Sequence, residues 1–457
     1  MPFVRGDLVM ERGDKRVNGT AHAAVAGAWL AMVMGPPRIY PPLPWPLIGL
    51  IDVMEWVFVL YSLYTVAIPL AGFFRRRPPV RVEPQARFAI VIPAHNEGRV
   101  LAPLIECCKN LDYPEALYDV HVIADYCGDD TAAVARAAGA RVIVRTNHDQ
   151  RGKGYALDYA FRKINAESRG YDAFVVFDAD NLVHPDFLNV MNSYVAAGHQ
   201  VIQGRMDAKN PTDSWISATF GMSVWVSNRF WFLAKHNIGF SSVLGGTGMC
   251  ISTELVRQIG WGATSFTEDL EFTMKALLAG VKTAWAHDAI CYDEKVLTFA
   301  ASWKQRVRWV QGQATVARMY MGATAKRGLR EAAPIFIEAT FQMFTPFYLM
   351  LGTLLMLLGY VIPGEFMTDP ILHRLASSGF WLALMILEYS LPIAAAVIDG
   401  LPRRALLYLP LYPVFLNSWV PLTWYGLLRR KPRHWTHTEH TRAMAYSELV
   451  ALRAGRR

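Results

Sequence analysis

The amino-acid sequence predicts an α/β domain with a mostly parallel sheet, joined to a helical membrane region. Between residues 88 and 177, short apolar runs of strand length alternate with an amphipathic stretch of helix length. Longer apolar runs lie on both sides of this block. Hydrophobic residues make up 53% of the 457 residues and charged residues only 18%, which argues against a wholly soluble chain.

The N-terminal part contains one clear membrane segment. Residues 1–46 form an extension whose apolar run, residues 22–35, is too short to cross a bilayer; a signal peptide and an interfacial helix both remain open for it. Residues 47–77 are expected to be a transmembrane helix, because an apolar run ends there in Arg75-Arg76-Arg77. This basic cluster predicts that the following segment is cytoplasmic.

Four buried strands are expected in the central block. They are predicted at residues 88–92, 119–124, 140–144 and 173–177, with a helix at residues 100–111 between the first two. Strands that alternate with helices form a mostly parallel sheet, because each helix carries the chain back to the same end of the sheet. Ligands of such sheets bind beyond the carboxyl ends of the strands.

Polar residues follow three of these strands and are expected to line one crevice. They are Pro93, Asn96 and Glu97 after the first strand, Asp125 after the second, and Asp178-Ala179-Asp180 after the fourth. Two carboxylates one residue apart can hold Mg²⁺ or Mn²⁺, and such an ion can bridge a diphosphate. The same pattern also occurs in ordinary Asp-rich turns.

The C-terminal part predicts further membrane segments. A basic amphipathic stretch, residues 314–336, is expected to be an interfacial helix. Residues 337–428 are expected to form transmembrane and interfacial helices, and the last of them, residues 405–428, is interrupted by three prolines. A re-entrant or interfacial course is favoured for that last segment, because it keeps the basic tail, residues 429–457, on the cytoplasmic side.

The charge and the cysteines exclude other classes of protein. The net charge is +8, but basic clusters such as Arg75-Arg76-Arg77 and Arg403-Arg404 stand beside apolar stretches, which is typical of membrane flanks and not of a nucleic-acid groove. The five cysteines show no paired metal-ligand spacing and all lie in the central block. Their placement fits a reduced, cytosolic environment.

Four motifs in order give the chain a family resemblance. Asp125, Asp178-Ala179-Asp180, Thr267-Glu268-Asp269 and Gln305-Arg306-Val307-Arg308-Trp309 resemble the D, DxD, TED and QxxRW signature of membrane-bound, processive family 2 glycosyltransferases. Cellulose, hyaluronan, chitin and poly-N-acetylglucosamine synthases belong to that family. The resemblance runs from about residue 88 to about residue 313. It implies a GT-A type nucleotide-sugar-binding domain with a Rossmann-like, mostly parallel sheet over residues 85–313.

The resemblance also implies roles for individual residues. Asp269 is the expected general base, with Glu268 as its rival, and Arg308 is expected to stabilise the departing diphosphate. Thr267 is alternatively the cap of a helix that begins there. Asp178 and Asp180 are the expected ligands of Mg²⁺ or Mn²⁺. The residues expected to bind the donor or the acceptor are Pro93, Asn96, Glu97, Asp125, Lys153, Asp178, Gly246, Thr247, Glu268, Gln305, Trp309, Trp435 and Thr438.

One further candidate, His287, and the two tail residues Trp435 and Thr438 also have simpler interpretations. His287 is considered as an extra metal ligand, but a lone histidine is more often a hydrogen-bonded structural residue. Trp435 and Thr438 lie in a tail that loosely resembles the gating segment of polymer synthases, and an ordinary basic juxtamembrane tail is the alternative.

The resulting prediction is an inverting, metal-dependent β-glycosyltransferase that uses a UDP-sugar. Its favoured product is an extracellular polysaccharide, made processively by a multi-pass protein of the plasma membrane with a cytoplasmic catalytic domain. Expected partners are the UDP-sugar donor, a glycan or lipid acceptor, membrane lipids, and a second copy or an accessory export protein; nucleic acid is not expected. A non-processive, glycolipid-forming transferase and a catalytically inert sugar-nucleotide sensor remain as alternatives.

Overall fold

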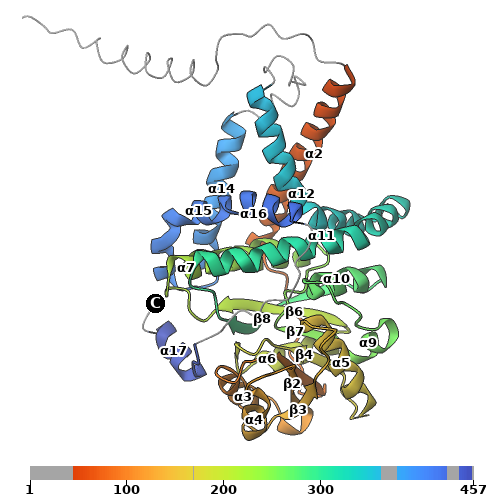
Figure 1. Cartoon of the computed structure of the whole chain (residues 1–457), viewed down its shortest axis with the longest axis vertical. Coiled ribbons are helices and arrows are strands. Elements are labelled where there is room, and N and C mark those ends of the chain that lie inside the picture. The colour runs from red at the N-terminus through yellow and green to blue at the C-terminus, as the bar shows by residue number, and fades with distance from the viewer. Residues whose placement is uncertain (1–44, 168, 362–377, 430–441, 455–457) are drawn as a thin grey trace, which may run out of the picture.

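The structure is a computed structural model, and it describes residues 45–167, 169–361, 378–429 and 442–454. The expected apolar run at residues 22–35 and the expected gating residues Trp435 and Thr438 lie outside the described residues. Figure 1 shows two parts: an α/β body around one sheet, and long helices that rise from one side of that body.

The sheet has eight strands in the order β3-β2-β1-β4-β7-β6-β8-β5. Their bounds are β1 Phe88–Ala94, β2 Tyr118–Asp125, β3 Arg141–Arg145, β4 Ala173–Val176, β5 Leu182–Val183, β6 Val201–Ala208, β7 Met249–Ser252 and β8 Thr283–Asp293. The first four strands are parallel, as predicted. β7 is antiparallel to both β4 and β6, so the complete sheet is mixed.

Alternate side chains of the strands pack into two apolar cores, one on each face of the sheet. In β1, Phe88 and Ile90 join one core while Ala89 and Val91 join the other, because successive residues of a strand point to opposite faces. The first core includes residues of α3 (Leu101–Lys109), α4 (Thr131–Ala137) and α6 (Phe187–Ala196). The second includes residues of α5 (Lys153–Ala166), α9 (Thr253–Ile259) and α10 (Glu268–Leu278). The sheet therefore lies between two helical layers.

Four helical segments of the described part are long and apolar enough to cross a membrane, judged by length and composition. Three are the helices α2 (Trp45–Leu70), α12 (Pro334–Val361) and α14 (Ser378–Ile398), close to the predicted spans. The fourth, Arg403–Leu428, is divided into η5 (Arg403–Leu411), α15 (Tyr412–Asn417) and α16 (Trp419–Leu428). In Figure 1, α15 and α16 lie across the direction of α2 and α12. An interfacial course for this segment remains a prediction.

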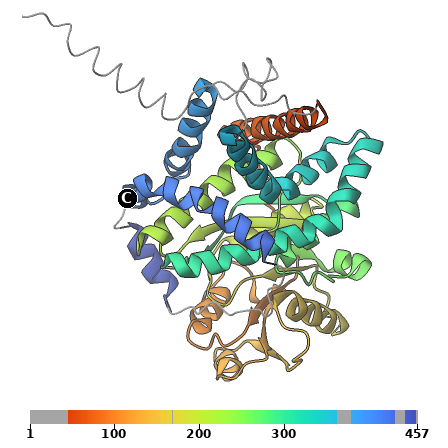
Figure 2. The ribbon, with the colours of Figure 1, turned by 45° about the horizontal axis from the view of Figure 1, so that its top comes forward.

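One helix, α11 (Phe299–Arg330), runs without interruption through the expected boundary at residue 313. The Gln-x-x-Arg-Trp motif and the basic stretch after it therefore belong to one helix, and residues 314–336 do not form a separate one. The helix ends before Pro334, where Ala332 takes a left-handed φ of 49° and α12 begins. Figure 2 shows α16 meeting α11 on the side from which the long helices rise, and the two helices are in contact.

A buried polar cluster joins the long helices to the α/β body. The Lys235 ammonium lies 2.6 Å from a carboxylate oxygen of Glu338, and the Tyr64 hydroxyl donates to the same carboxylate at 2.7 Å. Lys235 belongs to α8 (Ala234–Asn237), Glu338 to α12 and Tyr64 to α2. A buried ion pair is stable only with additional hydrogen bonds, which Tyr64 supplies here. These contacts fix α2 and α12 against the segment that follows α7 (Trp215–Ser227).

Candidate active site

The two carboxylates expected to bind metal follow the carboxyl end of β4. Asp180 is held at both carboxylate oxygens: Oδ1 accepts from the Asn181 amide at 3.2 Å, and Oδ2 accepts from the backbone N–H of Glu294 at 3.0 Å. The backbone N–H of Asp178 donates to the Thr247 hydroxyl at 3.1 Å, and that hydroxyl donates to Asn181. The loop before β7 and the end of β8 thus fix the Asp-Ala-Asp turn.

Lys153 connects three of the sequence motifs. Its ammonium donates to Asp178 Oδ1 and to the carbonyl of Gly246, each at 2.6 Å, and lies 3.6 Å from Glu268 Oε1. Burial alone would lower the pKa of Lys153, but the carboxylates of Asp178 and Glu268 outweigh burial and raise that pKa above its ordinary value. Lys153 therefore stays charged where the Asp-Ala-Asp, Gly-Gly-Thr and Thr-Glu-Asp segments meet.

Glu268 and Asp269 open α10, as expected for the Thr-Glu-Asp motif. Burial raises the pKa of both carboxyl groups, and the charge of Asp178 adds to the rise. Lys153 opposes the rise in both groups, and the backbone N–H of Leu270 opposes it in Asp269. A Cβ placed on Gly246 would lie 3.3 Å from Asp269 Oδ2, so the Gly-Gly-Thr loop passes close to this carboxylate. A half-buried carboxyl group with a raised pKa is suited to accept a proton.

Thr267 is the N-cap residue of α10, as the alternative expected, but its side chain does not cap the helix. The Thr267 side chain makes no capping hydrogen bond, and its buried hydroxyl oxygen has no hydrogen-bond partner among the described residues. The reason is the neighbouring helix. A Cβ on Gly312 of α11 would lie 2.6 Å from the Thr267 methyl carbon and 2.9 Å from its backbone nitrogen. α11 thus packs directly on the start of α10, and Gly312 permits the contact.

The residues expected to bind the nucleotide lie at the ends of β1 and β2. Asp125 pairs with Arg145 of β3 at 2.6 Å, and both side chains are almost fully buried. Burial raises the pKa of the Asp125 carboxyl group, and Arg145 opposes that rise. Asn96 takes a left-handed φ of 56°, and its side-chain oxygen accepts from the Gly128 backbone at 2.8 Å. Pro93 lies within β1 itself.

Arg145 also connects the expected nucleotide side to Lys153. Its second guanidinium nitrogen donates to the carbonyl of Gln150 at 2.6 Å, in the loop that leads into α5 and Lys153. Arg145 belongs to none of the four sequence motifs. The only signal was its place at the end of a predicted strand beside the one that ends in Asp125.

The two arginines of the Gln-x-x-Arg-Trp motif have different surroundings. Arg306 is fully buried, donates to the Ser418 hydroxyl at 2.8 Å, and stacks on the Phe415 ring at 4.4 Å. It therefore binds α11 to α15 and the start of α16. Arg308 is half-buried, and burial lowers its pKa from the ordinary arginine value. Gln305 and Trp309 are also half-buried on the same helix.

Trp309 belongs to an aromatic cluster. Its ring meets Phe220 of α7 edge to face at 5.7 Å and lies nearly parallel to Trp419 of α16 at 6.5 Å. Such pairs are preferred aromatic geometries, so part of this ring's role is to pack α11 against its neighbours.

The alternative role of His287 as a metal ligand is wrong. Its Nδ1 accepts from the Trp285 indole at 3.2 Å, and its Nε2 faces Asp399 Oδ1 at 3.1 Å. Nδ1 therefore carries no proton, and Nε2 donates to Asp399. Asp399 also pairs with Arg229 at 2.5 Å. His287 thus connects β8 to the end of α14 and lies in a structural network.

The donor set of the site suits a divalent cation that is shared with a substrate. Among the described residues, no group of three His, Cys, Asp or Glu side chains is arranged to hold a metal ion. Mg²⁺ usually binds through one or two carboxylates and completes its shell with phosphate oxygens and waters, and Asp178 and Asp180 supply such a pair.

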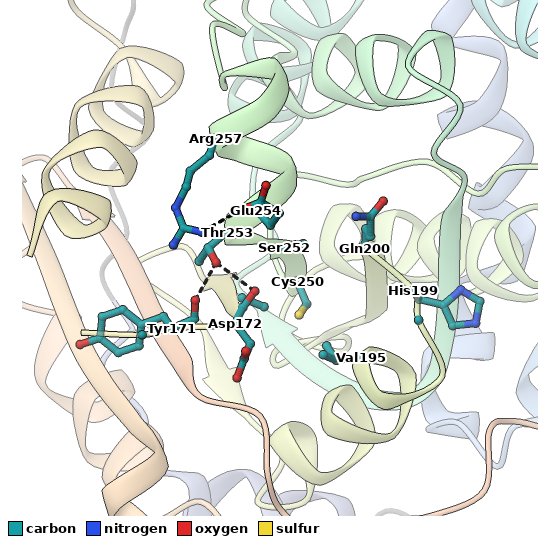
Figure 3. Close-up of a pocket in the computed structure, with 13 residues that line it drawn as sticks. Tyr171, Asp172, Val195, His199, Gln200, Cys250, Ser252, Thr253, Glu254 and Arg257 are labelled. Atoms are coloured by element: carbon teal, nitrogen blue, oxygen red, sulfur yellow. Dashed lines mark hydrogen bonds and ion pairs between the residues drawn. The ribbon is translucent and has the colours of Figure 1, made fainter. Parts of the chain in front are cut away.

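A separate cavity of about 550 Å³ lies at the other end of β4 (Figure 3). Its wall includes Asp172, where the hydroxyl of Thr253 donates to the backbone carbonyl at 3.2 Å, and the surface pair of Arg257 with Glu254. Asp172 precedes β4, whereas Asp178 follows it. This cavity is therefore distinct from the carboxylate site.

Comparisons with known proteins show the family of the chain. The family described as "Glycosyltransferase like family 2" matches residues 84–312, half of the chain, so the chain belongs to that family. The probable glycosyltransferase YdaM of Bacillus subtilis (strain 168) is 24% identical over 327 residues, which cover 66% of this chain and 73% of that protein. The protein is a family 2 glycosyltransferase.

A second relative and a solved structure are more distant. The β-monoglucosyldiacylglycerol synthase of Trichormus variabilis is 27% identical over 236 residues, and the alignment covers 49% of this chain and 48%, or about half, of that relative. The mannosyltransferase PcManGT of Pyrobaculum calidifontis, solved with GDP-Man and Mn²⁺, has a TM-score of 0.51 at 18% identity and covers 75% of this chain and 98% of its own. This likeness shows the GT-A fold.

Proposed function

We propose that this protein transfers a sugar from a UDP-sugar to an acceptor at a membrane surface, with inversion at the anomeric carbon and with the help of a divalent cation. The contacts of Lys153 carry the proposal, because one ammonium group touches Asp178 and Gly246 and lies 3.6 Å from Glu268. The segments to which we assign metal, donor and acceptor binding are thus in contact through one side chain.

The diphosphate of the donor would lie beside Asp178, Asp180 and Lys153. The two carboxylates would hold a divalent cation, which would supply positive charge to the leaving diphosphate. Lys153, whose ammonium donates to Asp178, would also bind a phosphate oxygen of the donor. Asp125, Pro93, Asn96 and Glu97 would bind the base and ribose at the ends of β1 and β2.

The acceptor would be activated by Asp269. Its carboxylate takes the proton of the acceptor hydroxyl as that oxygen attacks the anomeric carbon from the face opposite the diphosphate. Glu268, which is closer to Lys153, would assist in placing the donor. Arg308 stays charged at neutral pH and would stabilise the departing diphosphate, while Gln305 and Trp309 would contact the acceptor.

A membrane lipid is the acceptor that we favour. The relative from Trichormus variabilis is named as a β-monoglucosyldiacylglycerol synthase, and the motif-bearing helix α11 contacts both α12 and α16, which belong to the candidate membrane segments. A lipid hydroxyl at the bilayer surface would be presented beside the site. The catalytic domain would then face the cytoplasm, as the basic cluster Arg75-Arg76-Arg77 indicates.

A growing glycan chain is the second candidate. The aromatic cluster of Trp309, Phe220 and Trp419 supports it, because flat apolar rings are suitable platforms for sugar rings. In that case the product would be an extracellular polysaccharide, and a second copy or an export partner would add to the helices of one chain.

Product analysis tests the proposal. The purified protein in lipid bilayers is given radiolabelled UDP-sugars, Mg²⁺ or Mn²⁺, and diacylglycerol. We expect one labelled glycolipid, and no product after chelation of the metal. A ladder of glycans without labelled lipid would replace the lipid acceptor with a polymer. Binding of UDP-sugars without any turnover or hydrolysis would refute the catalytic assignment and favour a sensor.

A further inference from the structure

The last described segment of the chain, residues 442–454, folds back onto the loop that carries Asp180. It includes α17 (Tyr446–Ala454), which Figure 1 shows beside the end of β8. This segment lies far beyond residues 84–312, the part that matches the family. Its contacts with the metal-binding loop therefore come from outside the shared catalytic domain.

The most direct of these contacts passes through Lys209. Its side chain is buried, and its ammonium donates to the backbone carbonyl of Asp180 at 2.6 Å and to that of Arg442 at 3.3 Å. The same ammonium lies 3.5 Å from a carboxylate oxygen of Glu294, whose backbone N–H holds Asp180 Oδ2. One buried positive charge thus connects the Asp-Ala-Asp turn, the end of β8 and the C-terminal segment.

Apolar packing holds the same turn from behind. Leu182, two residues after Asp180, is buried together with Tyr292 of β8 and with Met444 and Leu449 of the C-terminal segment. Met444 and Leu449 are each only 2% exposed. Both side chains are removed from water when the segment docks, so apolar burial stabilises the docked position.

Two ion pairs fix the segment in register. Arg453 donates to Asp207 Oδ2 at 2.8 Å, and Asp207 is buried and accepts from the Trp225 indole through its other carboxylate oxygen. Arg442 pairs with Asp213. The two acidic partners lie near the end of β6, Asp207 within the strand and Asp213 shortly after it. The C-terminal segment is therefore attached to the same part of the chain as Lys209.

We propose that residues 442–454 and Lys209 together position Asp180 for binding of the metal–diphosphate group, with Lys209 as the positioning residue. The inference rests on the proposed function, because Asp180 is there a ligand of the cation. Lys209 acts through the backbone of Asp180 and does not itself touch substrate. Loss of its hydrogen bond lets the Asp-Ala-Asp turn relax, and the cation then binds more weakly.

The test compares three variants of the full-length protein in lipid. Lys209→Met removes the ammonium and keeps the length of the side chain. Arg453→Gln loosens α17 without altering any residue that touches Asp180. Lys275→Met is the matched control, because Lys275 also joins two backbone carbonyls, those of Gly260 and Trp261, at 2.9 and 3.1 Å.

Binding of Mn²⁺ in the presence of UDP is measured from the electron paramagnetic resonance signal of free Mn²⁺. We expect Lys209→Met to weaken binding roughly 10–100-fold, Arg453→Gln to weaken it toward the lower end of that range, and Lys275→Met to leave it unchanged. At saturating Mn²⁺ the kcat of both test variants should return to near the wild-type value. A merely destabilised protein would lose kcat at every Mn²⁺ concentration.

Hydrogen exchange of residues 178–183 gives a readout that needs no activity. Arg453→Gln should increase exchange of these residues. If Lys209→Met does not fold, this measurement on Arg453→Gln tests whether the C-terminal segment positions Asp180. Wild-type Mn²⁺ affinity and wild-type exchange in Arg453→Gln would overturn the inference. Wild-type protein that binds no Mn²⁺ with UDP would refute the proposed function instead, so the two failures are distinguishable.

Discussion

Replacing Gly312 by alanine should disturb the expected base without touching it. Gly312 lies on α11, three residues after Trp309, and it faces the start of α10. An added Cβ would meet Thr267 at its methyl carbon, hydroxyl oxygen and backbone nitrogen, at 2.6, 2.7 and 2.9 Å. Rotation of the Thr267 side chain relieves the first two contacts but not the third, which is to backbone.

The size of the effect follows from these distances. Ordinary contact begins at about 3.4 Å, so the backbone nitrogen at 2.9 Å must move by about half an ångström. Glu268 and Asp269 follow directly and move with it. A misplacement of 1 Å can cost about 100-fold in rate, so we expect kcat to fall on the order of tenfold. Overpacking costs about 1–3 kcal/mol in stability, and the better helix propensity of alanine offsets about 1 kcal/mol of that.

Gly322 provides the matched control on the same helix. It is exposed, and a Cβ there would meet nothing within 4 Å. Gly322→Ala should therefore keep the wild-type kcat and gain up to about 1 kcal/mol in stability. The assay is initial-rate transfer at saturating donor and metal, with thermal unfolding followed in parallel. Equal kcat values for the two alanine variants and the wild type would show that α11 does not set the position of Asp269.

Three further outcomes are expected. Asp269→Asn should abolish sugar transfer while UDP and Mn²⁺ still bind, as measured by calorimetry; transfer at the wild-type rate would exclude Asp269 as the base. Because burial raises the pKa of Asp269 and a base must be deprotonated, kcat/KM should fall as pH decreases through a value well above 4, the ordinary carboxyl range; a profile that is flat to pH 4 would contradict this. Trp309→Ala should reduce transfer to the acceptor more than hydrolysis of the donor, whereas Trp309→Phe, which retains an aromatic ring beside Phe220, should be milder; equal losses in both reactions would contradict an acceptor role.

The parallel half of the sheet could be predicted because its information is local. β1 and β4 are continuous apolar runs, and β2 ends in the apolar residues 122–124 before Asp125. Parallel pairing brings the carboxyl ends of these strands, with the carboxylates there, to one edge of the sheet. The other half could not be predicted in the same way. β5 has only two residues, too few to show a period, and the pairing of β6, β7 and β8 depends on contacts between strands that are far apart in the chain.

Within the candidate site, the order of the motifs in the sequence predicted the site residues. The contacts between those residues depend on long-range packing. The charge of Lys153 could be read from the chain, but its simultaneous contact with Asp178 and Gly246 required the turn of α5 to meet the loop before β7. The contact of His287 could not be predicted, because its partner Asp399 lies 112 positions away along the chain and no local pattern connects the two residues.

The sequence by itself determined the apolar segments, the parallel strands and the identity of the carboxylates, because hydrophobic period and residue type act over a few neighbours. Only the tertiary structure decided which arginine of the α11 motif is buried against α15, why position 312 must be glycine, and how Lys209 connects the C-terminal segment to Asp180. Those features depend on close approach of segments that are far apart in the chain, and close packing of side chains becomes definite only when all of them are in place.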